Sequence, residues 1–126
     1  MVARFMTGQA TRGYWAVEVR PAPGVGDPLG SEAAEALAHE GLAASVTSAR
    51  TFLLSPALGL DLVEAAVREL LADPTAEVAG ITAPGDTPQR PDGVLAVHVC
   101  PLPGVTDNLA AAVREALQLI AIAPRR

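Results

Sequence analysis

The chain has 126 residues, half of them hydrophobic, and a formal net charge of −5. Its basic residues form no continuous stripe, which argues against nucleic-acid binding, and no run approaches the roughly 18 apolar residues of a membrane span. The single cysteine, Cys100, cannot form an internal disulfide. We therefore expect a cytoplasmic protein that binds neither membranes nor nucleic acid.

The first residues of the chain and its first strand differ clearly in pattern. Residues 1–13 have no hydrophobic period, and we expect them to be a disordered leader. Residues 14–20 alternate between apolar and polar types, which predicts a strand with Val17 and Val19 on its apolar face. This strand opens the first of two modules, which we expect to span residues 14–83.

A turn and a helix start follow this strand. Pro23 fixes one backbone angle and Gly24 permits a positive one, so the pair predicts a turn that continues through Val25. Asp27 is typical of a helix N-cap and Pro28 of the first helical position. Apolar residues at helical spacing then continue the helix.

Strand, helix and strand complete the first module. Residues 45–54 contain β-branched and aromatic types that favour a strand, with Arg50 and Phe52 inside it. Residues 62–72 carry apolar side chains at helical spacing, which predicts the strongest helix of the module. A short strand is expected over residues 77–82.

The second module repeats the beginning of the first. After residues 84–93, which are rich in proline and glycine and typical of a linker, the stretch 17–37 recurs as 97–117 with 11 of 21 positions identical. Such self-similarity marks an internal repeat. We expect a strand over residues 94–100 followed by the same turn and capped helix, so that 94–126 form a partial second module.

These elements predict an α+β fold of two layers. An antiparallel sheet would carry helices on one face and consist of a β-α-β-α-β unit with a partial β-α repeat. A lone strand and helix cannot bury their apolar faces, so the partial repeat must dock on the first module or on another chain. We also expect dimerisation through the sheet.

No residue pattern predicts a catalytic, metal or cofactor site. The glycines of residues 24–30 have the spacing G-x-G-x-x-x-G instead of the dinucleotide fingerprint, and the repeat keeps only the first of them. The cysteine and the two histidines match no zinc spacing, and the serines lack a nucleophile-elbow context. We expect a chain that binds no cofactor and is not an enzyme by itself.

The sequence V-E-V-R-P-A-P-G-V-G-D-P-L-G, residues 17–30, resembles the opening of the PurS family. This family comprises the small subunit, or the equivalent N-terminal domain, of phosphoribosylformylglycinamidine synthase. Arg50 and Phe52 stand at the usual basic and aromatic positions of its second strand. The resemblance covers the first copy to about Thr82 and the second over about residues 94–120.

The resemblance implies a non-catalytic component of de novo purine biosynthesis. Such units bridge the glutaminase and the ATP-dependent synthetase, so that ammonia released from glutamine reaches the activated substrate. The implied partners are these two components and a second copy of the chain. The residues expected to serve interaction or structure are Pro23, Gly24, Val25, Asp27, Pro28, Arg50, Phe52, Pro103, Gly104, Val105 and Asp107.

Two alternatives share the same strand and helix pattern without this role. The first is a ferredoxin-like regulatory module that binds a small molecule, such as an amino acid, at a strand–helix corner. The second is a truncated fragment of a long-form synthase.

Overall fold

The computed structural model describes residues 3–6, 13–101, 104 and 107–122. It has the expected α+β architecture, with antiparallel strand pairing. No helix in this described part combines the length and hydropathy that a bilayer crossing requires. In chain order the elements are β1 (Ala3–Met6), β2 (Trp15–Pro21), α1 (Pro28–His39), β3 (Arg50–Leu54), α2 (Leu60–Ala66), the π-helical turn η2 (Val67–Leu71), β4 (Glu77–Thr82), β5 (His98–Pro101) and α3 (Asn108–Ile122).

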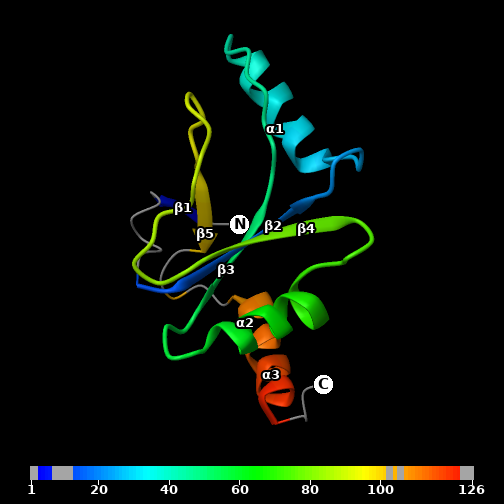
Figure 1. The fold of residues 1–126 in the computed structure, drawn as a ribbon. Helices are drawn as coiled ribbons and strands as arrows, with labels where there is room; N and C mark the ends of the chain where they lie inside the picture. Colours follow the sequence, from blue (N-terminus) through cyan, green and yellow to red (C-terminus); the bar gives the residue numbers. More distant parts are fainter. Residues whose placement is uncertain (1–2, 7–12, 102–103, 105–106, 123–126) are drawn as a thin grey trace.

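β2 is the central strand of a three-stranded antiparallel sheet with the order β3-β2-β4 (Figure 1). Val17 lies opposite Phe52 of β3 and Ile81 of β4. The strand expected over residues 14–20 is thus confirmed, but its polar face is not open to water: Ala16 and Glu18 are also buried.

The core lies on one face of this sheet, between the sheet and the helical layer of α2, η2 and α3 (Figure 1). Val17 and Val19 belong to the same buried cluster as Val63 of α2 and Val113 of α3. The helix expected over residues 62–72 has its final residues in the wider π-helical form. Helices and sheet each bury one apolar face in this way, as two-layer folds require.

Helix α1 departs from this arrangement, because it projects away from the sheet (Figure 1). Gly30 is the only buried residue within Pro28–His39, and Leu29 is 67% exposed. The chain returns beside α1 through residues 42–49, which form no strand. The strand expected over residues 45–54 is therefore shorter, since its first residues contact the start of α1 instead of β2.

Two further expectations are corrected near the chain start and in the second module. Ala3–Met6, expected to be disordered, form β1 and pair antiparallel with β5. The strand expected over residues 94–100 begins only at His98. β1 and β5 lie on the side of the three-stranded sheet that faces away from α2 and α3 (Figure 1).

Candidate functional site

The expected corner between β2 and α1 is present and lies at the surface. Val25 donates a backbone hydrogen bond to the carbonyl of Ala22 at 2.9 Å, which closes the turn. Gly24 has a φ of 84°, a conformation that favours glycine. Pro23 and Val25 are exposed, so the apolar part of the turn faces solvent.

Asp27 holds this corner together with more contacts than an ordinary N-cap. Its carboxylate accepts from the backbone N–H of Gly30 at 3.0 Å, as the cap prediction requires. It also accepts from the N–H and hydroxyl of Ser48, at 2.7 and 2.5 Å. The hydrogen bonds from Ser48, and then that from Gly30, lower the pKa of Asp27. Asp27 therefore joins α1 to the returning segment, a role that the sequence pattern did not predict for Ser48.

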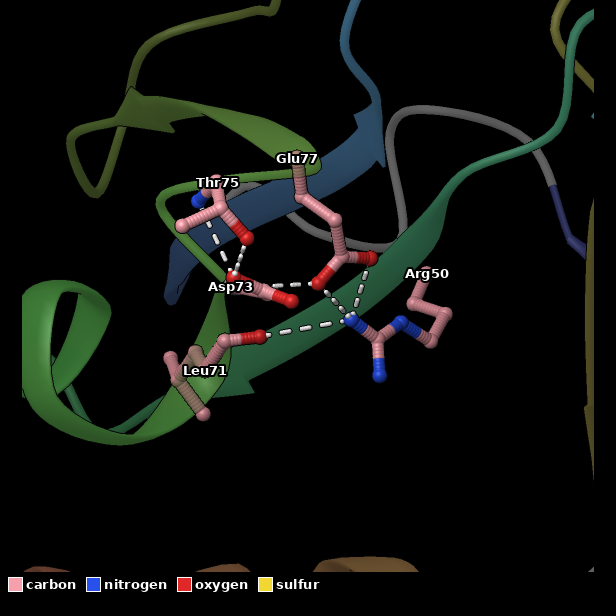
Figure 2. Close-up of polar contacts among 5 residues, drawn as sticks. All are labelled: Arg50, Leu71, Asp73, Thr75 and Glu77. Carbon is pink, nitrogen blue, oxygen red and sulfur yellow. Dashed lines mark hydrogen bonds and ion pairs between the residues drawn. The ribbon is translucent and has the colours of Figure 1, made fainter. Parts of the chain in front are cut away.

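Arg50 forms the centre of a second polar group at the start of β3 (Figure 2). Its Nη2 contacts both carboxylate oxygens of Glu77, at 2.8 and 2.7 Å, and lies 3.4 Å from the carbonyl oxygen of Leu71. The guanidinium carbon lies 5.9 Å from the ring centre of Phe52, within cation–π range. Arg50 thereby connects β3 to β4 and to the end of η2.

The turn between η2 and β4 completes this polar group (Figure 2). Asp73 donates its backbone N–H to Glu77 at 3.0 Å and accepts from the N–H and hydroxyl of Thr75 at 2.9 and 2.7 Å. The hydrogen bonds from Thr75 lower the pKa of Asp73. The carboxylates of this turn are thus occupied by neighbouring donors.

A small pocket of about 190 Å³ separates the corner from Arg50. It brings together Asp27, Pro28, Arg50 and Glu77, which are far apart in the sequence. Both carboxylates already accept hydrogen bonds from other parts of the chain. The pocket is therefore small and its acidic groups are satisfied without a ligand, which favours a structural role over binding.

An ion pair with a buried carboxylate, which the sequence pattern did not predict, ties the expected linker to the sheet. Glu18 of β2, whose side chain is 8% exposed, accepts from Arg90 at 2.9 and 2.6 Å and from Arg20 at 3.1 Å. The hydrogen bond from Arg90 lowers the pKa of Glu18 against the effect of burial, and the charges of Arg90, Arg20 and His98 lower it further. Residues 84–93 are thus not a free linker, because Arg90 anchors them across the sheet.

A shallow hollow of about 850 Å³ opens beside this ion pair. Glu18, Arg20, Asp86 and Arg90 are among its lining residues, so charges of both signs face it. Arg90 is committed to Glu18 in a bidentate pair. The lining of the hollow therefore favours neither an anionic ligand nor a cationic ligand.

The second corner is described only in part. Gly104 has a φ of 86°, close to that of Gly24, and Asp107 accepts from the backbone N–H of Ala110 at 2.9 Å. The expected turn glycine and cap are thus confirmed in the repeat. Pro103 and Val105 lie outside the described residues.

The described residues bring the expected positions together in two places, the Asp27 corner and the Arg50 group. Within the ranges given above, no group of three or more His, Cys, Asp or Glu residues is placed to hold a metal ion. His98 Nε2 is buried without a hydrogen-bond partner in this part of the chain. Comparison with known proteins found no matching family model, no matching curated protein and no matching solved structure.

Proposed function

We propose that this chain is a non-catalytic assembly component of phosphoribosylformylglycinamidine synthase. In this role it bridges the glutaminase and the ATP-dependent synthetase, so that ammonia passes between them during purine biosynthesis. The specific pathway rests on the PurS-like sequence of residues 17–30. The more general role, assembly, rests on the geometry of the corner and of α1.

The observation that carries the proposal is that α1 is an amphipathic helix that projects from the sheet and packs on neither sheet of the described part of the chain (Figure 1). Its apolar residues follow helical spacing, yet only Gly30 is buried. The turn before it adds the exposed Val25. Helices in globular proteins gain most of their stability by packing an apolar face, and exposed apolar surface of this kind marks interaction sites.

The polar groups around the corner also support assembly over catalysis. The Asp27 and Glu77 carboxylates accept hydrogen bonds from neighbouring donors, and the Arg50 guanidinium bridges two strands. A catalytic acid, base or nucleophile needs a free position directed at a substrate. These residues instead fix the shape of the surface that a partner would contact.

A reconstitution experiment tests the proposal. The chain is mixed with glutaminase and synthetase components, glutamine and ATP, and complex formation is followed by light scattering after size exclusion. We expect a complex, and we expect glutamine-dependent amidation to need the chain while ammonia-dependent amidation does not. Absence of a complex, or substrate turnover by the chain alone, would contradict the proposal.

Two exposed valines provide a matched pair for this experiment. Val25→Asp places a charge in the corner, and Val94→Asp places the same charge outside it; the two side chains have similar exposure. We expect only Val25→Asp to weaken the complex, by tenfold or more. Equal weakening by both variants would show that the corner is not the contact surface.

A second candidate function, binding of an amino acid, is favoured by the pocket between Asp27 and Arg50. A carboxylate could pair with Arg50 and an ammonium group with Glu77, at the cost of the contacts these residues make now. Calorimetry with amino acids tests it. Binding that is abolished by Arg50→Met but kept by Arg68→Met would favour this function over assembly.

A further inference from the structure

The two copies of the repeat place their strands back to back. Glu18 of β2 and His98 of β5 are counterparts at the offset of 80 positions, and β5 lies on the side of the three-stranded sheet that faces away from α2 and α3 (Figure 1). Ala16 and Glu18 are buried, and Nε2 of His98 is buried too. The polar faces of β2 and β5 are therefore turned toward each other, and their apolar faces point outward in opposite directions.

The outward faces differ sharply in how they are covered. Val17 and Val19 of β2 are 0% and 1% exposed beneath the helical layer. Their repeat counterparts, Val97 and Val99, are each 59% exposed. The same apolar sequence is thus core in one copy and open surface in the other.

The repeat helices show the converse difference. α3 contributes the buried Val113 to the core that contains Val17 and Val19, with Leu117 packed against it. The counterparts of these residues in α1 are Ala33 and Leu37, which are half-buried but do not belong to this core cluster. The helix of the second copy therefore packs in the layer over the first copy's sheet, whereas the helix of the first copy packs on no sheet within the described residues.

We propose that two copies of this chain form a twofold dimer in which α1 of each copy covers the Val97 and Val99 face of the other. The occupant is indicated by the repeat itself, because α3 already packs in the layer over the equivalent face around Val17 and Val19. A reciprocal contact of this kind is isologous and closes as a twofold dimer. The dimer also gives a partner to the two faces named here, that of α1 and that of Val97 and Val99. The inference extends the expected self-association and does not depend on the synthase partners.

Mixing two complementary variants of the isolated chain tests the exchange. Ala33→Asp charges the apolar face of α1, and Val99→Arg charges the face of β5. A dimer of one copy of each variant has one Asp–Arg contact and one unaltered contact, whereas a dimer of either variant alone has two altered contacts. By sedimentation velocity we expect a wild-type dimer, weakening of each single variant's dimer by tenfold or more, and recovery of a dimer in the mixture.

Ser31→Asp serves as the control, because it adds the same charge to α1 about 200° around the helix from Ala33. Ser31 is exposed, and we expect this variant to remain dimeric. Circular dichroism of each variant verifies that it is folded. A wild-type chain that stays monomeric at high concentration would overturn the inference, as would a dimer that resists both charged variants. Failure of the mixture to recover a dimer would overturn the reciprocal exchange.

Discussion

Gly30 and its repeat counterpart Ala110 hold the same place in their helices but meet different surroundings. A Cβ atom at Gly30 would lie 2.6 Å from the backbone carbonyl oxygen of Val46 and against the Asp27 carboxylate. This close approach exists because the returning segment brings Val46 and Ser48 onto the first corner. The glycine of the first copy is therefore required by packing, not by a phosphate-binding loop.

Gly30→Ala should lower the free energy of unfolding by about 1–3 kcal/mol, the usual cost of overpacking. Alanine would otherwise favour the helix by about 1 kcal/mol, so a net loss requires the clash. Urea denaturation measures the change. Gly26→Ala is the control, since no atom lies within 4 Å of a Cβ built there. Unchanged or increased stability of Gly30→Ala would contradict the close approach.

Two helices that share one sequence pattern are stabilised differently in this protein. α3 packs on α2 and η2 and contributes Val113 to the core. α1 projects from the sheet and is joined to the returning segment at Asp27, which accepts from Gly30 and Ser48. α1 therefore depends on its local contacts far more than α3 does.

Removal of the N-cap side chains, Asp27 of α1 and Asp107 of α3, should destabilise α1 more than α3. Asp27→Ala loses the cap and both Ser48 bonds, whereas Asp107→Ala loses its bond to Ala110 from a helix that the core already holds. We expect a larger loss of helical circular dichroism at 222 nm for Asp27→Ala, and Ser48→Ala should reproduce part of it. Equal losses for the two cap variants would show that α1 does not rely on its corner.

At the scale of the whole molecule, one ion pair connects segments that are distant in the sequence. Arg90 reaches Glu18 across 72 positions and ties residues 84–93 to the central strand. Glu18 has a lowered pKa in the folded chain, chiefly because Arg90 donates to it. A carboxylate with a depressed pKa stabilises the fold above its unfolded pKa, and this contribution is lost as the pH falls through the folded pKa.

Acidification should therefore lower the free energy of unfolding, and part of this loss should depend on the ionised Glu18 carboxylate. Wild-type stability should fall as the pH drops below about 4.5, the ordinary pKa of glutamate. Glu18→Gln should be less stable than wild type at pH 7 by about 1–3 kcal/mol, because Arg90 keeps no charged partner, and should lose less on acidification. Denaturation midpoints across pH measure both effects, with the exposed Glu69→Gln as control. Parallel pH curves for wild type and Glu18→Gln would refute this role.

Local sequence was sufficient for the features that depend on neighbours in the chain. Residues close together in the sequence determine the alternation in β2 and the position of β4 over Glu77–Thr82. The same is true of the Asp27 cap with Pro28 after it. The α+β class and the antiparallel pairing followed from the same pattern. Arg50 was singled out by its place in the second strand, but its partner Glu77 was not.

Tertiary structure alone decided where each apolar face is placed. Helical spacing shows that α1 and α3 each have an apolar face, but not that α3 covers the core around β2 while α1 projects from it. The same holds for Ser48 on Asp27, Arg90 on Glu18, and the pairing of Ala3–Met6 with β5. The reason is physical: periodicity records which side of an element avoids water, whereas its partner is chosen by contacts between segments far apart in the chain.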